Sequence, residues 1–267
     1  MTNKILIATH RPYTMPTAQI YLPVQVGAYS KKSLGYTRDD SGDNISSLND
    51  RFCELTALYW AWKNTDYDSV GLVHYRRYFA GCEKFNVGGK NKKILSESEL
   101  ENLLERTDII LPQKRHYYIE TLYSHYAHTT YPEPLDEAGR IIAEFYPEYS
   151  KEFEKLKSRR SAHIFNMFIM KRDLADRYCE WLFDILFKLE QRTDAAAYDK
   201  FHARYIGRIG ELLLDVWINT NGLKYKEVKV TYTEQVNWIK KGARFLRAKF
   251  GNKKYDESSS DYKEIKG

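Results

Sequence analysis

Residues 68–79 read DSVGLVHYRRYF. The apolar, β-branched part of this stretch, SVGLV, is typical of a strand buried in the middle of a sheet. The part that follows adds a histidine, two arginines and three aromatic rings. Such polar side chains are costly to bury without partners. The stretch therefore predicts a central strand whose carboxyl end carries polar groups for a reason other than packing.

Strands and helices are expected to alternate on both sides of this stretch. Short apolar runs predict strands, and apolar residues spaced three and four positions apart predict helices. Such alternation favours an α/β fold in which helices flank a mixed sheet. The expected strands are residues 4–8, 20–28, 69–79, 108–112, 162–171 and 224–234, and the expected helices are 46–64, 96–107, 133–158, 172–192 and 208–222.

Local signals mark the ends of these helices. Ser96 and Glu99 have the spacing of a capping box, and Asn49 or Asp50 is expected to cap the first helix. Pro147 should divide the third expected helix in two, because a proline inside a helix removes a backbone hydrogen bond.

Length and composition predict one large domain. The chain has 267 residues, 43% of them hydrophobic, and a formal net charge of +6. Its three cysteines lack the spacing of a zinc site or a disulfide framework. Neither a signal peptide nor an apolar run of about 18 residues is present, so a cytoplasmic protein is expected. The expected organisation is a domain over 1–230, a basic amphipathic segment over 231–251 and a disordered tail over 252–267.

Basic side chains follow three of the expected strands. In open α/β sheets, ligands bind beyond the carboxyl ends of the strands. Arginine and lysine there would suit a diphosphate or another polyanion. Three unrelated, solvated strand ends are the alternative. The residues are Thr9, His10 and Arg11 after the first strand, His74, Tyr75, Arg76 and Arg77 after the central strand, and Gln113, Lys114, Arg115 and His116 after residues 108–112.

Several function classes lose their main support. The chain has no GxGxxG after the first strand, no GxxxxGK[ST], no GxSxG and no HExxH, which argues against nucleotide oxidoreductases, P-loop kinases, serine hydrolases and zinc proteases. Basic charge interleaved with aromatic residues keeps nucleic-acid binding open. Because no nucleic-acid-binding module is recognisable, no nucleic-acid partner is expected.

Five motifs in consistent order carry a resemblance to a known family. They are THRPYTMP…IYLPVQVGA, DDSGDNISSLNDRFCELTALYWAWKN, GLVHYRRYF, DIILP and NMFIMKRDLADRYCEWLFDIL, and they extend over about Lys4 to Val230. Together they resemble a bacterial family of capsular and exopolysaccharide glycosyltransferases that was long catalogued as a domain of unknown function. The resemblance implies a GT-A-like fold and an inverting transferase. It also implies a UDP-sugar donor, with galactofuranose as the expected sugar.

The resemblance assigns roles to the polar residues at the strand ends and in the loop before residue 50. A nucleotide-sugar donor needs a pocket for the base, countercharges for the diphosphate and hydrogen bonds to sugar hydroxyls. For Glu54, an exposed carboxylate in a first helical turn is the alternative. The expected substrate-binding residues are Thr9, His10, Arg11, Tyr13, Asp43, Asn44, Asn49, Glu54, His74, Arg76, Arg77, Asn166 and Arg208.

His74 and Arg76 occupy the place where most GT-A enzymes carry a DxD metal motif. The chain has no such motif there, which leaves a Mn²⁺ or Mg²⁺ requirement open. Because side chains alternate along a strand, His74 and Arg76 are expected to share one face and to point at the donor diphosphate. Arg77 is expected on the other face, in a structural ion pair.

An inverting transferase needs a carboxylate base, and the last expected helix offers two. Glu211 is the first candidate and Asp215, one turn later on the same face, is the second. An exposed helix face would explain both residues equally well. Asn166 interrupts an apolar run, which fits either a ligand-facing amide or a core amide bonded to the backbone.

The C-terminal segment combines aromatic and basic residues. Over residues 231–251 this pattern favours a helix lying on an anionic membrane surface or, alternatively, one packed on the domain. A membrane contact would suit a polyprenyl-diphosphate-linked acceptor at the inner face of the cell membrane. The alternative function is a non-catalytic protein that binds a nucleotide sugar or polysaccharide.

Overall fold

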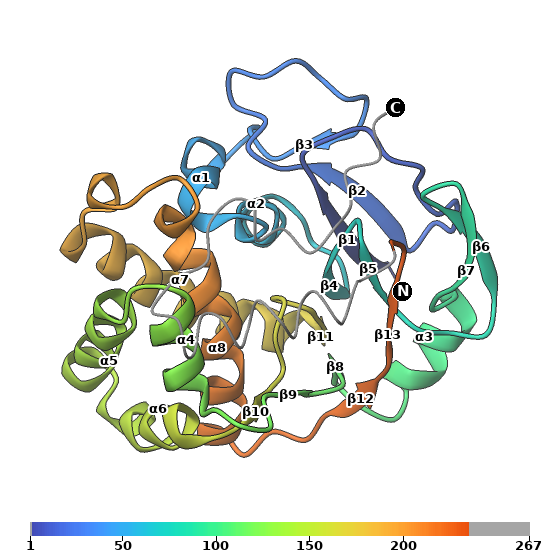
Figure 1. Ribbon diagram of the computed structural model, residues 1–267. Coiled ribbons are helices and arrows are strands. Elements are labelled where there is room, and N and C mark those ends of the chain that lie inside the picture. Colours follow the sequence, from blue (N-terminus) through green and yellow to red (C-terminus); the bar gives the residue numbers. More distant parts are fainter. Residues whose placement is uncertain (1, 235–267) are drawn as a thin grey trace.

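A computed structural model describes residues 2–234 of the chain. Its centre is a nine-stranded mixed sheet in which seven strands follow the order β12-β8-β11-β4-β1-β2-β3, while β5 and β13 pair beside β4 (Figure 1). The α/β sheet flanked by helices is therefore confirmed. The strands are β1 (Asn3–Thr9), β2 (Tyr21–Gln25), β3 (Thr37–Arg38), β4 (Ser69–His74), β5 (Arg77–Phe79), β8 (Ile109–Pro112), β11 (Phe168–Lys171), β12 (Lys226–Val228) and β13 (Val230–Tyr232); two small sheets pair β6 (Lys84–Val87) with β7 (Lys90–Lys93) and β9 (Arg115–His116) with β10 (Ser161–Ala162).

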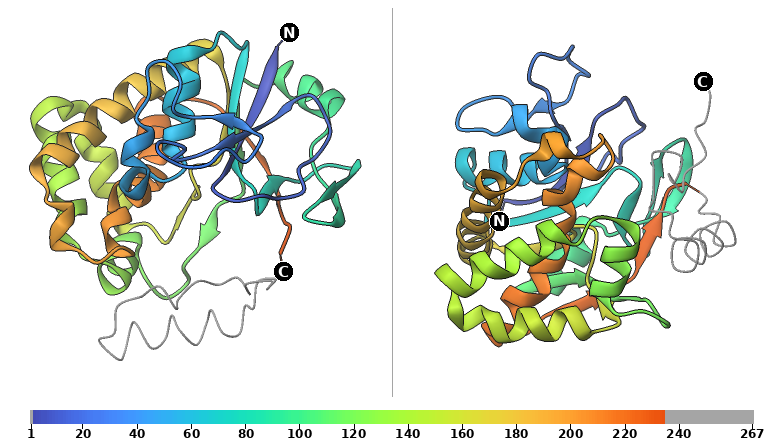
Figure 2. Two further views of the ribbon diagram at one scale, coloured as in Figure 1. Left: turned by 90° about the horizontal axis from the view of Figure 1, so that it is seen from above. Right: turned by 60° about the vertical axis from the view of Figure 1, so that its left-hand side comes forward.

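Helices cover both faces of this sheet. Alternate β1 residues enter two separate cores, Leu6 and Ala8 on one face and Ile5 and Ile7 on the other. The first core contains residues of most of the helices, and the second contains α3 (Figures 1 and 2). The helices are α1 (Asn49–Phe52), α2 (Leu55–Asn64), α3 (Glu97–Leu104), α4 (Leu122–Thr129), α5 (Glu133–Phe145), α6 (Pro147–Ser158), α7 (Arg172–Arg192) and α8 (Tyr205–Thr220), with short 3₁₀ turns at Ser46–Leu48, Ala195–Ala197 and His202–Arg204.

Strand register brings distant loops to one edge of the sheet. β1 runs parallel to β4 and to β2, with Ala8 opposite His74 and Thr9 opposite Gln25. β11 runs antiparallel to β4, with Phe168 opposite Leu72. The carboxyl ends of β1, β2 and β4 therefore lie at the same edge as the segment that leads into β11.

The central stretch does not form one strand, contrary to expectation. β4 ends at His74, the chain turns at Tyr75 and Arg76, and β5 returns antiparallel with Arg77 paired to His74. Strand alternation therefore does not place His74 and Arg76 on one face.

The first expected helix is also interrupted. Cys53 has φ 55° and ψ −132°, which separates α1 from α2. Neither Asn49 nor Asp50 is the cap, because the residue before α1 is Leu48 and makes no side-chain capping bond. The break packs against α8 at Gly207, where an added Cβ would lie 3.0 Å from the Cys53 side chain.

Other boundaries differ in detail. The expected strand 162–171 is divided by a turn in which Phe165 and Asn166 have φ values of 81° and 51°. The capping box of Ser96 and Glu99 is confirmed, as is the helix break at Pro147. β13 continues to Tyr232, beyond the expected domain end at 230, and the remainder of the 231–251 segment and the 252–267 tail lie outside the described residues.

Candidate active site

Basic side chains from three segments meet at the edge where β1 and β4 end. The pKa of His10 is lowered to about 4, first by desolvation of its ring and then by the charges of Arg76, Arg11, Arg204 and Lys31. Side chains from the loop after β1, from the turn after β4 and from the residue before α8 are therefore close in space. We call this group the basic cluster, and it consists of His10, Arg11, His74, Arg76, Arg77, Arg204 and Arg208.

His74 stays neutral inside the basic cluster. Burial lowers its pKa well below the usual value, and the charges of Arg77 and Arg76 add to that effect. Its Nδ1 accepts the backbone N–H of Arg76 at 3.3 Å, so the ring hydrogen resides on Nε2. His74 is thus a hydrogen-bond donor and not a countercharge.

Several side chains of the basic cluster pack against the ring of Tyr75. Its side chain is fully buried, and the guanidinium carbons of Arg11 and Arg76 lie 5.1 and 4.9 Å from its ring centroid. The rings of His10 and His74 pack against it at 5.6 and 4.3 Å. Cation–π contacts of this kind favour the charged groups while leaving their N–H donors available. Sequence analysis did not select Tyr75 as a site residue.

The ion pair expected for Arg77 is found at Arg76 instead. Arg76 and Arg11 both form ion pairs with Glu234, each at 3.2 Å. Arg77 stacks on the ring of Phe165 at 4.1 Å, and its buried Nε has no hydrogen-bond partner. Within residues 2–234, no ion pair of Arg77 is present. Arg77, which was expected in an ion pair, therefore forms none within residues 2–234, although its charge acts on the nearby carboxylate of Glu211.

Two carboxylates lie near each other beside the basic cluster. Glu211 accepts the backbone N–H of Phe165 at 3.0 Å. Glu54 accepts an amide N–H of Asn166 at 2.8 Å. Burial raises the pKa of Glu211, the charge of Glu54 raises it further, and Arg77 lowers it. One left-handed turn thus orients both carboxylates.

Asn166 has the backbone bond of a core amide, and its expected role as a ligand-facing amide stays a prediction. Its side-chain nitrogen donates to Glu54 and to the carbonyl of Gly207, at 2.8 and 3.0 Å. Its side-chain oxygen is buried and has no partner. A buried acceptor of this kind is rare in a native protein unless a ligand or water completes it.

The start of α8 brings two arginines to the site: Arg204 immediately precedes the helix, and Arg208 lies in its first turn. Arg204 donates from Nε to the thiol sulfur of Cys53 at 3.2 Å. Arg208 donates to the carbonyl of Phe201 at 3.0 Å, and burial lowers its pKa. Both lie within two turns of Glu211, so cations and a carboxylate share one end of the helix.

Asp215 does not share this site. Its carboxylate contacts Nδ1 of His163 and accepts that residue's backbone N–H, and the other ring nitrogen of His163 lies 2.9 Å from Glu227. Asp215 is fully buried. The oxygens of Asp215 already hold the segment before β11, so the structure favours Glu211 over Asp215 as the base candidate.

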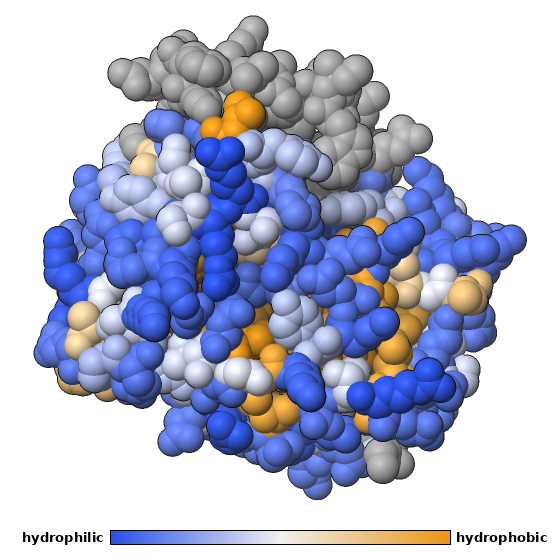
Figure 3. Space-filling view, turned by 90° about the horizontal axis from the view of Figure 1, so that it is seen from below, coloured by the Kyte–Doolittle hydropathy of each residue, from blue (hydrophilic) through white to orange (hydrophobic). Residues whose placement is uncertain are grey.

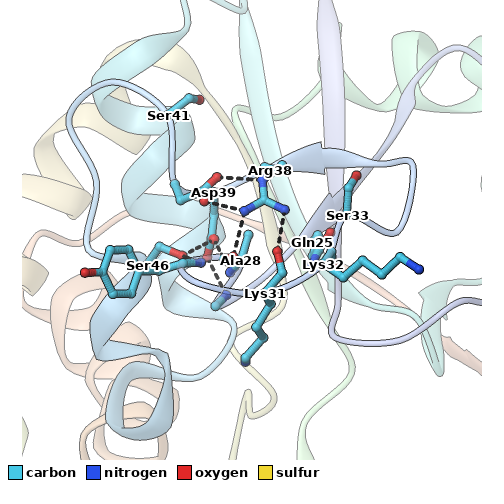
Figure 4. Close-up of polar contacts among 12 residues, drawn as sticks. Gln25, Ala28, Lys31, Lys32, Ser33, Arg38, Asp39, Ser41 and Ser46 are labelled. Carbon is cyan, nitrogen blue, oxygen red and sulfur yellow. Dashed lines mark hydrogen bonds and ion pairs between the residues drawn. The ribbon is translucent and has the colours of Figure 1, made fainter.

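Asp39 holds the polar loop beyond β2 together, and it was not among the expected site residues. Asp39 is fully buried and accepts the backbone N–H groups of Gly27 and Ala28, at 2.8 and 2.9 Å, and the hydroxyls of Ser46 and Thr56, at 2.5 and 2.6 Å. Figure 4 shows Asp39 and its neighbour Arg38 pointing into the loop from β3. A carboxylate with four donors is a structural anchor.

Three expected ligand contacts in the same region also have structural partners. Asp43 accepts the Tyr59 hydroxyl at 3.2 Å. Asn44 closes a local turn by bonding Gly42 and Ser46. Asn49 donates to the carbonyl of Cys53 at 2.7 Å. These side chains are not brought into the basic cluster.

Thr9 and Tyr13 are close to the cluster but are already bonded. The Thr9 hydroxyl is buried and donates to the carbonyl of Arg11 at 2.8 Å. Tyr13 donates to Thr233 at 2.8 Å, and its ring packs 4.9 Å from Tyr75. Both residues fix the loop after β1.

The third expected basic strand end contributes less directly. Lys114 donates to the Tyr225 hydroxyl at 3.2 Å, and Arg115 stacks on Tyr117 at 5.2 Å. Burial raises the pKa of Tyr117, and the nearby charges of Arg115 and Glu211 act on it in opposite directions. Two of the three strand ends therefore form the basic cluster, and the third borders the carboxylate side.

No metal-binding group is formed within residues 2–234: no three His, Cys, Asp or Glu side chains are arranged to hold an ion. The residues that could neutralise a diphosphate here are the arginines of the basic cluster. His74 lies at the carboxyl end of the central strand, where the resemblance places a metal-binding motif in other GT-A enzymes.

The surface of the described part is mainly hydrophilic, with separate apolar patches on the face seen from below (Figure 3). Its exposed large hydrophobic residues are Tyr29, Tyr118, Ile119 and Phe145. Over residues 2–234, no helix has the length and apolar character needed to cross a bilayer. The membrane contact expected from residues 231–251 stays a prediction.

Comparisons with known proteins identify relatives of this chain. A family described as "Domain of unknown function (DUF4422)" matches residues 4–222. A solved structure of WbbM, named as a bifunctional glycosyltransferase in its apo form, superposes with a TM-score of 0.79 and 31% sequence identity. The match covers 88% of this chain and 46% of that one, so this chain spans less than half of WbbM. No curated protein matches this chain.

The fold and the comparisons agree. The mixed sheet, its flanking helices and the match to a glycosyltransferase structure confirm the GT-A-like fold that the resemblance implies. The family match extends over the strands and helices that position the basic cluster and the two carboxylates. The chain belongs to the DUF4422 family.

Proposed function

We propose that this protein is an inverting glycosyltransferase that moves a sugar from a UDP-sugar to a lipid-linked oligosaccharide. The observation that carries the proposal is the meeting of Glu211 with the basic cluster at the carboxyl ends of β1 and β4. A transferase needs a base and countercharges within the length of one substrate, and this edge of the sheet supplies both.

The basic cluster is suited to the leaving diphosphate. Arg77 is the strongest candidate contact, because it forms no ion pair within the described residues and its buried Nε lacks a partner. Arg208 is partly buried, and Arg204 is exposed, so both can supply donors. Arginine forks bind phosphate oxygens in pairs, which stabilises the negative charge that develops on UDP.

Glu211 is suited to act as the base. An acceptor hydroxyl oxygen forms a bond to the anomeric carbon from the face opposite UDP, and its proton passes to Glu211. The bond from that carbon to the phosphate oxygen breaks, and its electron pair leaves with UDP. The raised pKa of Glu211 favours proton uptake, and Arg77 nearby limits that rise.

The identities of the sugar and the acceptor rest on the family resemblance. Galactofuranose is the proposed donor sugar, and a polyprenyl-diphosphate-linked oligosaccharide of a capsule or exopolysaccharide is the proposed acceptor. Such an acceptor places the reaction at the cytoplasmic face of the membrane. WbbM supports transfer of a sugar in general, since its name states only a glycosyltransferase.

The test is transfer from a panel of UDP-sugars to a lipid-linked acceptor, with and without a metal chelator. Glu211→Gln should lower turnover by about 1000-fold while UDP binding persists, because general base catalysis contributes on that order. The exposed Glu101 provides the matched control, Glu101→Gln. Full activity of Glu211→Gln would refute the base assignment. A wild-type protein that binds UDP-sugar without turnover would favour the binding-protein alternative.

A further inference from the structure

A second group of aromatic side chains adjoins Arg208. The ring of Phe201 lies 4.1 Å from the Arg208 guanidinium and 5.2 Å from the ring of His202. Tyr131 packs edge-on against His202 at 4.9 Å, and Tyr198 lies 5.1 Å from Tyr131. We call these four rings, Tyr131, Tyr198, Phe201 and His202, the aromatic group.

His202 has one nitrogen held and one nitrogen unpartnered. Its Nδ1 lies 2.5 Å from the carboxylate of Asp199, which also accepts the backbone N–H groups of Phe201 and His202. The residue is only 5% exposed, and its Nε2 is buried without a hydrogen-bond partner. Because the carboxylate accepts a hydrogen from Nδ1, Nε2 of the neutral ring is a hydrogen-bond acceptor.

A buried acceptor among aromatic rings has the chemistry of a sugar site. Carbohydrates present apolar C–H faces that pack on aromatic rings and hydroxyls that need polar partners. Tyr131, Tyr198 and Phe201 are each only partly buried, so the group reaches the surface. Arg208 joins this group to Glu211, because it contacts Phe201 and lies within one turn of Glu211 on α8.

We propose that the aromatic group is the subsite for the acceptor sugar, with a sugar hydroxyl donating to Nε2 of His202. The inference rests on the proposed transferase function and adds where the acceptor binds. An acceptor held there would lie beside Arg208, within one helical turn of Glu211, while the donor diphosphate would occupy the arginines of the basic cluster. Asp199 is then a positioning residue that fixes the imidazole ring.

The test separates acceptor binding from donor binding. The probes are octyl β-galactoside, octyl β-glucoside and octyl N-acetyl-β-glucosaminide, whose binding to the protein without donor is measured by saturation-transfer NMR. His202→Phe keeps an aromatic ring but removes the acceptor nitrogen, and Tyr198→Ala removes stacking area. Each should raise the acceptor Kd and KM about 5- to 10-fold, the loss expected for one hydrogen bond or one ring contact. UDP binding should stay within about 2-fold.

Phe145→Ala is the matched control, since Phe145 is a 44% exposed ring on α5. Thermal unfolding checks that each variant is folded, and Tyr198→Ala serves if His202→Phe is not. Unchanged glycoside affinity in a folded variant would overturn the subsite. The subsite would also be overturned if none of the three glycosides bound the wild-type protein at about 10 mM. Binding free energies of a few kcal/mol are detectable at this concentration. If the wild-type protein binds the glycosides but does not turn over any UDP-sugar, that result would instead count against the proposed function.

Discussion

The loop anchored by Asp39 and the site around Glu211 contain similar residues but differ in how far their polar groups are satisfied. Asp39 accepts four hydrogen bonds, and Arg38 beside it donates to the carbonyls of Ala28 and Lys31. At the other site Arg77 keeps a buried Nε without a partner. The loop is complete without a ligand, and the site is not.

The difference shows that the hydrogen bonds of a buried charged group indicate whether it has a structural or a functional role. A fully bonded carboxylate stabilises a loop, whereas unpaired buried donors and acceptors are retained where a substrate completes them. The pKa values point the same way. Glu211, His10 and His74 are all shifted by burial and by neighbouring charges. Shifts of this kind gather at functional sites.

After Glu211→Gln, the largest expected effect is on transfer, at Arg77. Arg77→Ala should lower kcat/KM for the UDP-sugar by about 100-fold, the loss typical of removing one charge-stabilising donor. Its thermal midpoint should change little, because the side chain has no ion pair within the described residues. Arg140→Ala is the control, since Arg140 is 70% exposed and pairs only with Glu137 on its own helix. If Arg77→Ala transfers sugar normally, the Arg77 guanidinium does not stabilise the leaving diphosphate and has another role.

The next effect is on stability, at Asp39. Asp39→Ala should lower the free energy of unfolding by about 3 kcal/mol, because it leaves several buried donors unsatisfied. Urea unfolding measures this loss. Asp50→Asn should change stability by less than about 0.5 kcal/mol, since the Asp50 side chain is 68% exposed. Equal effects of the two substitutions would abolish the distinction between anchor and surface carboxylate.

Elements with strong periodicity were predictable from the sequence. α7 has the expected bounds, and α3 has the expected capping box, because both depend on residues three or four positions apart. The breaks at Cys53 and at Phe165 were not predictable. Both residues adopt positive φ without being glycine, so tertiary contacts impose a conformation that no local pattern announces.

The site was predictable in part. Glu54, Asn166 and Glu211 were each selected from the sequence, and the structure brings them together. Asp39 was missed in favour of Asp43, because a polar loop gives no sign of which carboxylate turns inward. The pairing of Arg76 with Glu234 joins residues 158 positions apart in the chain, and such a contact has no sequence signal.

The smallest expected effect is on the pH dependence, at Glu54. Glu211 must be deprotonated to accept a proton, so the rate should rise as the pH passes upward through its raised pKa. Burial is the main cause of that raised value, and the charge of Glu54 is the second. Glu54→Gln should therefore move the rising limb of kcat/KM to lower pH without removing it. A limb that moves to higher pH would contradict the coupling of the two carboxylates.

The same raised pKa acts in the opposite direction on stability. A carboxyl whose pKa is higher in the folded than in the unfolded protein stabilises the fold when protonated, and this contribution is lost as the pH rises through the raised value. Activity should thus appear in the pH range in which Glu211 ceases to stabilise the fold. Glu211→Gln, which stays neutral, should remove that decline in the free energy of unfolding, whereas Glu101→Gln should retain it. Urea unfolding on both sides of the rising limb measures the difference, and an unchanged decline in Glu211→Gln would assign it to another group.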